Sequence, residues 1–423
     1  MEDATTIVSE FPDYFWHEEE LFSPYKIGQN WFGERVSSDN PSVSVPVVFP
    51  NLVKTKALLV RGSLIGKINS GYLYYDVWVS NNHVMSHEPI KSIGDHYYGR
   101  PSSFEKQIVL DSDTTSIDLT MTPDPAAYIY LDYFEMYGWR QLKRTNDNFL
   151  FRLMPSQFGP EKTAVWVQNT NANYQLWDVS EPLQPMLQNG VYSGGKMVFA
   201  TNERSEKRYV MFKLSAAYRV TSWMPLHNQN VHGIAEADNL ILTAPIFFEQ
   251  AQALADYHAE RDGVTSVVVD VNEIYNEFST GRPEPTGIRD FVRMVYQRSG
   301  GRLKYLTLFG RASFDFRDLL GAGMNFVPCY ETLENPHHEL SFCADDYYAL
   351  MDDDEGINCS GRVDIGFGRI SVSTVEEAET VLRKIRHYDD KSATHGQWKT
   401  DVLFFADDEK ADYVRYIENY RLI

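Results

Sequence analysis

Cysteine and long hydrophobic runs are both scarce in this sequence. Three cysteines, Cys329, Cys343 and Cys359, occur among the 423 residues. Their spacings match neither a CxxC pair nor a zinc ribbon, which excludes a disulfide scaffold and leaves three ordinary thiols, or one bridge with one free thiol, as alternatives. No stretch approaches the roughly 20 apolar residues of a membrane-spanning helix. With 43% hydrophobic and 14% aromatic residues, the chain can nevertheless bury a large core.

Basic residues are also in short supply. The chain has 39 lysines and arginines against 59 aspartates and glutamates, a net charge of −20. Such a charge repels phosphate backbones and anionic lipid surfaces, so nucleic-acid binding is excluded. Residues 1–10 lack the basic start and apolar run of a signal peptide, which indicates either a cytoplasmic protein or one whose leader is missing from this sequence. The length predicts two or three domains.

Short alternating apolar runs separated by turns fill the N-terminal half. Period-two alternation with aromatic and β-branched residues predicts half-buried strands in antiparallel sheets, hence an all-β, sandwich or barrel-like region. We expect an N-terminal segment over 1–42, a β domain over 43–148 and a second β unit over 149–235. The expected strands are 43–49, 57–61, 72–79, 107–110, 116–121, 126–131, 149–153, 163–168, 195–200 and 208–213.

From about Ala235 the pattern changes to strands that alternate with amphipathic helices. This alternation predicts a parallel α/β sheet with right-handed crossovers over 236–423. Thr374 and Glu377 form the sequence pattern of a capping box at the start of one helix. The expected strands are 240–244, 265–271, 303–309 and 401–405, with 363–368 as strand or loop, and the expected helices are 248–261, 288–298, 375–388 and 410–420.

Two acidic groups are candidates for chemistry. Residues 345–356 hold six carboxylates and a glycine, and Asp345, Asp346, Asp352 and Asp354 are the candidate ligands of a hard cation such as Ca²⁺. A solvated acidic loop is the preferred interpretation, because the ligand alternation of an EF-hand is absent. The second group, residues 407–409, follows an expected strand, and the carboxyl ends of parallel strands are where ligands and catalytic groups gather.

The cysteines could also act as nucleophiles with a histidine as base. Thiolate catalysis needs such a pair, and His337, His338, His387 and His395 are the candidates near the cysteines in sequence. None of the three cysteines directly follows an apolar strand, so buried or loop cysteines are the preferred interpretation.

Several motifs of the C-terminal half resemble the gingipain family of cysteine peptidases, in particular the sortases that process cargo of type IX secretion. They are NLILTAP (239–245), YNEFSTG (275–281), PTGIRDF (285–291), KYLTLFG (304–310), NFVP (325–328), DDYY (345–348) and DIGFGR (364–369). In the β-rich half, NWFGE (30–34), YLDY (130–133) and LWDV (176–179) are similar to the region before the peptidase domain of those sortases.

The resemblance implies a caspase-like peptidase domain of two α/β subdomains, of which this chain holds the first. The nucleophilic cysteine and its histidine come from the second subdomain, so we expect them beyond Ile423 and expect this fragment to be inactive. The acid that orients the histidine is expected at Glu409, with Asp408 and Asp407 as second choices. Its role is to hold the imidazole in the tautomer that deprotonates the thiol. No cofactor is required.

The resemblance also implies a function at the bacterial outer membrane and cell surface. The full protein would remove C-terminal sorting domains from secreted proteins through an acyl-enzyme and pass the acyl group to water or to a lipopolysaccharide amine, in company with outer-membrane attachment-complex proteins. One rival is a non-catalytic docking module of an outer-membrane secretion or attachment complex. Another is a cytoplasmic caspase-like protein that uses Cys343 or Cys359.

Overall fold

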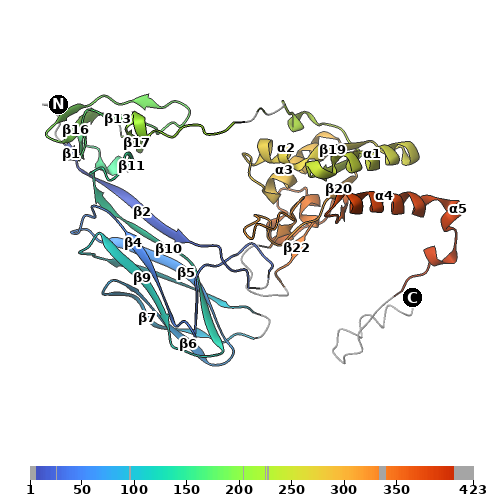
Figure 1. The fold of residues 1–423 in the computed structure, drawn as a ribbon, viewed down its shortest axis with the longest axis horizontal. Coiled ribbons are helices and arrows are strands. Elements are labelled where there is room, and N and C mark those ends of the chain that lie inside the picture. Colours follow the sequence, from blue (N-terminus) through green and yellow to red (C-terminus); the bar gives the residue numbers. More distant parts are fainter. Residues whose placement is uncertain are drawn as a thin grey trace.

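The structure is a computed structural model that describes residues 6–403 except 25, 95–96, 203, 224, 226–227 and 333–339. Figure 1 shows a β-rich part and an α/β part that lie side by side along the long axis of the molecule. No helix in these described ranges is long and apolar enough to cross a membrane. The predicted order, an all-β region followed by a parallel α/β domain, is confirmed.

The first β unit is a sandwich of two antiparallel sheets. One sheet has the order β2-β10-β5-β8 with β3 added to β10, and the other has the order β4-β9-β6-β7. The alternation seen in the sequence places the core: in β6, Leu73, Tyr75, Val77 and Val79 all point inward. The strands are β2 (Glu10–Glu18), β3 (Arg35–Ser37), β4 (Ser42–Val48), β5 (Leu58–Ile68), β6 (Tyr72–Val79), β7 (Asn82–Lys91), β8 (Arg100–Ile108), β9 (Thr114–Met121) and β10 (Ala127–Gln141).

A second, smaller sandwich follows. Its sheets have the orders β1-β12-β16-β15 and β11-β17-β13-β14, packed around Phe149, Phe151, Phe199 and Tyr209. Strand β1 pairs in parallel with β12, so residues 1–42 contribute strands to both sandwiches. The strands are β1 (Thr6–Val8), β11 (Asn148–Leu153), β12 (Thr163–Gln168), β13 (Gln175–Asp178), β14 (Met186–Leu187), β15 (Val191–Ser193), β16 (Lys196–Thr201) and β17 (Lys207–Phe212).

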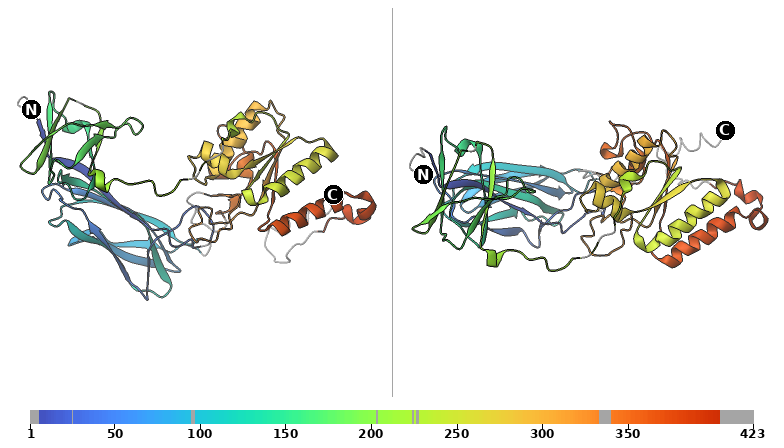
Figure 2. Two further views of the ribbon diagram at one scale, coloured as in Figure 1. Left: turned by 45° about the horizontal axis from the view of Figure 1, so that its top comes forward. Right: turned by 90° about the horizontal axis from the view of Figure 1, so that it is seen from above.

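The α/β part is built on a four-stranded parallel sheet with the order β19-β18-β20-β23. Helices α2 and α3 pack on one face, while α1 and α4 cover the other and lie side by side (Figure 2). Both faces are covered, so the central strand β18 is buried along its whole length. The elements are β18 (Asn239–Thr243), α1 (Phe248–Asp262), β19 (Ser266–Asp270), α2 (Val271–Phe278), α3 (Pro285–Arg298), β20 (Tyr305–Phe309), β21 (Tyr330–Glu331), β22 (Cys343–Ala344), β23 (Gly366–Ile370), α4 (Val375–Asp389) and α5 (Lys391–Thr394).

Capping residues close in sequence account for most of the helix and strand ends in this domain. The Thr374 hydroxyl accepts a hydrogen bond from the Glu377 amide at 3.2 Å, while the Glu377 carboxylate accepts one from the Ser373 amide at 2.7 Å, which caps α4. Helix α2 was not predicted: Asp270 caps it and ends β19, so Val271 begins a helix rather than ending a strand. The strand expected over 401–405 is absent at 401–403, and its remainder and the helix 410–420 lie outside the described residues.

Candidate functional site

A cleft with a volume of about 790 Å³ lies at the carboxyl edge of the parallel sheet. Segments that follow β20 and β23, together with the first turns of α4, form its walls. Because the carboxyl ends of parallel strands are the usual place for ligands in α/β domains, this cleft is the candidate functional site. Its polar lining consists of Arg311, Ser313, Cys329, Cys343, Asp345, Arg369, Ser371, Ser373, Glu376, Glu377, Thr380 and Lys384.

Arg369, at the end of β23, holds the floor of the cleft together. Its Nε and Nη2 donate to the two carboxylate oxygens of Asp345 at 2.7 and 2.6 Å, a forked ion pair. Nη1 donates to the carbonyls of Gly310 at 2.8 Å and Val327 at 2.6 Å, and Nη2 also reaches the Pro328 carbonyl at 3.2 Å. The side chains of Arg369 and Asp345 are only 10% and 20% exposed. A planar guanidinium thus ties three separate loops to one strand end.

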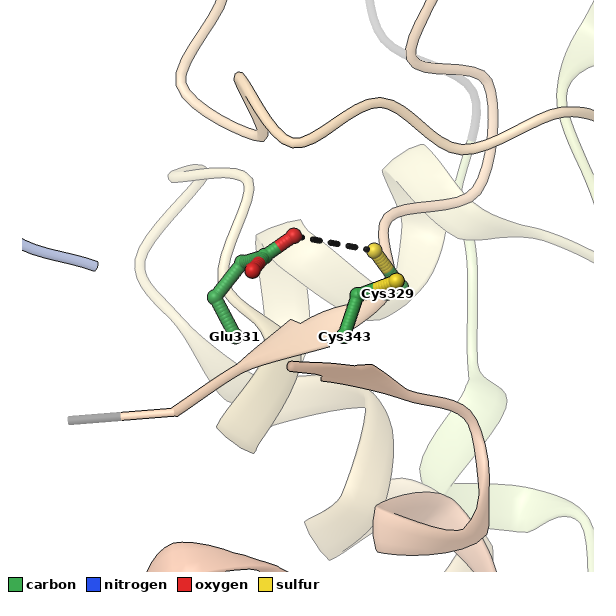
Figure 3. Close-up of side chains that lie close together, drawn as sticks. All are labelled: Cys329, Glu331 and Cys343. Carbon is green, nitrogen blue, oxygen red and sulfur yellow. Dashed lines mark hydrogen bonds between the residues drawn. The ribbon is translucent and has the colours of Figure 1, made fainter. Parts of the chain in front are cut away.

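A cluster of two thiols and a carboxylate lies beside this ion pair. In the short β21–β22 ladder Glu331 stands opposite Cys343, and Cys329 precedes Glu331 by two residues, which puts the three side chains on one side of the ladder (Figure 3). Their sulfur and oxygen atoms all lie within 4.8 Å of one another. Cys329 is buried and Cys343 is exposed.

The electrostatics of this cluster follow from burial and from the close thiols. Burial raises the pKa of Glu331 to about 7, outweighing the hydrogen bonds from the Gly28 amide and the Cys329 thiol. A hydrogen bond from the Cys329 thiol lowers the pKa of Cys343, and the pKa of Cys329 is raised in turn. Cys343 is therefore the thiol that loses its proton first.

Glu331 also joins this domain to the β-rich part. Its Oε2 accepts a hydrogen bond from the Gly28 amide at 2.9 Å, and its carbonyl accepts one from the Gln29 side chain at 2.7 Å. Nearby, the rings of Trp31 and Phe314 stack at 5.9 Å with an interplanar angle of 8°. The loop between β2 and β3 thus packs against the segments that carry the thiol cluster.

The structure does not bring the four predicted cation ligands together. Asp345 is held by Arg369, and Asp346 accepts a hydrogen bond from the Cys359 thiol at 3.4 Å. Asp352 and Asp354 are exposed, and the pKa of Asp352 is raised by the carboxylates of Asp364 and Glu355. In the described part of the chain, the one group of three His, Cys, Asp or Glu side chains with ligand atoms within 4.8 Å is Cys329, Glu331 and Cys343.

The predicted orienting acids Asp407, Asp408 and Glu409 lie outside the described residues, as do His337 and His338. His387 and His395 are described, and both are exposed.

The hydrogen-bond partners of the thiols among the described residues are carboxylates, a carbonyl and another thiol, and none is a histidine. The described residues thus contain no thiol–imidazole pair.

Two residues that shape the site were not singled out from the sequence. Arg369 ends the DIGFGR motif at a strand end, which is a usable signal for a side chain that faces the carboxyl edge. Glu331 gives no such signal, because only the pairing of β21 with β22 sets it opposite Cys343.

Comparisons with known proteins agree with this architecture. Residues 234–421 match the family model described as peptidase family C25. The crystal structure of dimeric latent PorU from Porphyromonas gingivalis aligns with a TM-score of 0.75 and 21% sequence identity, covering 98% of this chain and 41% of that chain. A complex of the pro- and mature domains of RgpB from the same organism aligns with a TM-score of 0.26 and 19% identity, covering 36% of this chain and 28% of that chain. No curated protein sequence matches.

The PorU alignment extends over both the β-rich and the α/β parts, although this chain spans only 41% of the PorU chain. The family match covers the segment that holds the parallel sheet and the cleft. Residues 234–421 therefore resemble the gingipain-type peptidases of family C25, and the chain as a whole has a fold similar to that of PorU.

Proposed function

We propose that these residues form the β-rich region and the first peptidase subdomain of a cell-surface cysteine endopeptidase and transpeptidase. Its substrates would be secreted proteins with C-terminal sorting domains, and its acyl acceptors water or an amine of lipopolysaccharide. The observation that supports this proposal most is the PorU fold over 98% of the chain, together with the family C25 match of residues 234–421.

The chemistry would proceed through an acyl-enzyme. A thiolate attacks the scissile carbonyl, and the amine of the sorting domain leaves with a proton from the paired histidine, which forms a thioester. Water or an acceptor amine then attacks the thioester carbonyl, gives up its proton and displaces the thiolate. Transpeptidation requires the amine to outcompete water at this second step. Glu409, or failing that Asp408 or Asp407, would orient the histidine.

The described residues contribute scaffold and cleft to this scheme. Among them no thiol is hydrogen-bonded to a histidine. The reactive cysteine and histidine of the proposed enzyme would come from the second peptidase subdomain. Residues 1–423 on their own are accordingly expected to be inactive. The β-rich part would serve to contact the cargo or outer-membrane attachment-complex proteins.

A thiol-directed peptidase probe on the complete protein tests the proposal. Labelling should persist when Cys329, Cys343 and Cys359 are all replaced by serine, and should disappear when a downstream cysteine is replaced. Replacing Glu409 with glutamine should lower the rate of cargo cleavage by up to about 10⁴-fold, as when the orienting acid of a triad is lost.

Two results would contradict the peptidase assignment. Labelling that is lost with Cys343→Ser would place the nucleophile in this part of the chain. Absence of labelling, combined with retained binding of cargo, would instead favour the non-catalytic docking module.

A further inference from the structure

We propose that Cys329 and Cys343 form a reversible disulfide at the edge of the cleft, with Cys343 as the attacking thiol, Cys329 as the resolving thiol and Glu331 as the proton acceptor. The proposed disulfide uses only described residues, and it does not depend on the proposed function.

The backbone brings the two sulfurs together. Strands β21 and β22 pair antiparallel with Glu331 opposite Cys343, and the side chain of Cys329 lies on the same side of the ladder. The sulfur atoms lie within 4.8 Å of each other, and the side chains of all three residues converge in Figure 3. Since a disulfide needs sulfurs about 2.05 Å apart, the bridge requires a further approach by side-chain rotation.

The two thiols differ in access. Both cysteines line the cleft, but Cys329 is only 6% exposed whereas Cys343 is exposed. An external disulfide therefore reaches Cys343 more readily than Cys329. The hydrogen bond from Cys329 lowers the pKa of Cys343, which increases the fraction present as the attacking thiolate.

Glu331 is placed to complete the reaction. Its Oε1 lies 3.5 Å from the sulfur of Cys329, and the side chain is fully buried. Burial raises the pKa of this carboxyl to about 7, so its carboxylate is a better base than an exposed one. No other carboxylate of the described residues is hydrogen-bonded to Cys329.

The exchange balances with the disulfide of a thiol oxidoreductase or a low-molecular-weight disulfide as oxidant. The Cys343 thiolate attacks one sulfur of the oxidant, forming a mixed disulfide and releasing the first thiolate. Cys329 then passes its proton to Glu331 as its sulfur attacks Cys343 Sγ, which breaks the mixed bond and releases the second thiolate. Two protein thiols are oxidised by two electrons, and one external disulfide is reduced to two thiols.

The bridge would fasten the part of the domain that contacts the β-rich region. Glu331 binds the Gly28 amide and the Gln29 side chain, so the two cysteines flank the residue that carries this contact. A disulfide between Cys329 and Cys343 cross-links β22 to the residue that precedes β21, and it removes the thiol proton donor from Glu331 Oε1.

Thiol counting and peptide mapping test the proposal in the 423-residue chain and in the complete protein. After equilibration with oxidised glutathione and denaturation, this part of the chain should show one free thiol instead of three, with a cross-linked peptide joining 329 and 343. Cys329→Ser should trap one glutathione on Cys343. Cys343→Ser should leave Cys329 unmodified in the folded protein. Cys359→Ser is the matched control and should still form the bridge.

The Glu331→Gln variant distinguishes a role of Glu331 in positioning the two thiols from a role in accepting the proton of Cys329. The mixed disulfide should form at the wild-type rate but resolve at least about tenfold more slowly, because the proton acceptor is lost. Thiol counting and peptide mapping are carried out on the wild-type protein, so the test remains valid even when a variant fails to fold. Three free thiols after equilibration, a bridge that includes Cys359, or one tightly bound Zn²⁺ per chain with Cys329 and Cys343 both reduced would overturn the proposal.

Discussion

Replacing Arg369 with lysine or methionine separates the charge of this side chain from its forked geometry. The guanidinium makes two hydrogen bonds to Asp345 and three to the carbonyls of Gly310, Val327 and Pro328. Lysine keeps the charge but offers donors from a single nitrogen, which cannot serve the carboxylate and the carbonyls together. Methionine keeps the volume and removes every donor.

The burial of the pair sets the magnitudes. Arg369→Met leaves the Asp345 carboxylate buried without its partner, which should lower the free energy of unfolding of the α/β domain by about 3–5 kcal/mol. Arg369→Lys should lower it by about 1.5–3 kcal/mol, the range for hydrogen bonds to charged groups. Adding Asp345→Asn to Arg369→Met should recover part of the loss, because no buried charge then lacks a partner.

Native-state hydrogen exchange with increasing urea measures these changes locally. Peptides from β20 and β23 report on the α/β domain, while peptides from β5 and β10 serve as an internal reference that should not change. An Arg369→Lys variant within about 0.5 kcal/mol of wild type, or a double variant whose loss equals the sum of the single losses, would refute the reasoning.

The remaining predictions concern a pH-dependent contact and a tight packing position. Burial alone would raise the pKa of Glu277, but hydrogen bonds from the Gln229 side chain, His232 and the Val231 amide lower it to about 2 from 4.5. The ionised Glu277 carboxylate therefore stabilises its contacts with residues 229–232 fully above about pH 4.5, and this stabilisation is lost as the pH falls toward 2. Hydrogen exchange of the backbone amides at 231–234 should show this loss in wild type but not in Glu277→Gln. Gly62→Ala should lower the free energy of unfolding of the first sandwich by about 1–3 kcal/mol in urea titrations, because a Cβ would lie 2.5 Å from the Phe104 ring and 2.6 Å from the Tyr133 carbonyl. Unchanged stability of this variant would show that Phe104 can move aside at no cost.

The element types could be predicted because each depends on residues close in sequence. The alternation in 72–79 predicts a half-buried strand, and the structure forms one in which Leu73, Tyr75, Val77 and Val79 point inward. Helix α2 was missed because the apolar run 265–271 continues into its first residue, and only the Asp270 cap ends the strand. A short helix of this kind has too few turns for its periodicity to show.

The acidic cluster shows what composition leaves open. Six carboxylates in 345–356 are compatible with a cation site or with a solvated acidic loop, and the composition does not show that Asp345 pairs with Arg369, which lies 24 residues further along the chain. Local charge cannot reveal such a partner, since the two meet only because β23 joins the sheet beside β20.

The sequence by itself determined the β-then-α/β order, many of the strands and helices, and the gingipain-like motifs of the C-terminal half. These follow from periodicity and capping, which act over a few residues. Only the tertiary structure decided that Arg369 organises the cleft floor, that Cys329 and Cys343 share one side of a hairpin, and that Glu331 is buried between them and Gly28. Those contacts join residues up to 303 positions apart, and they exist because burying apolar surface folds the chain back on itself, which no local pattern encodes.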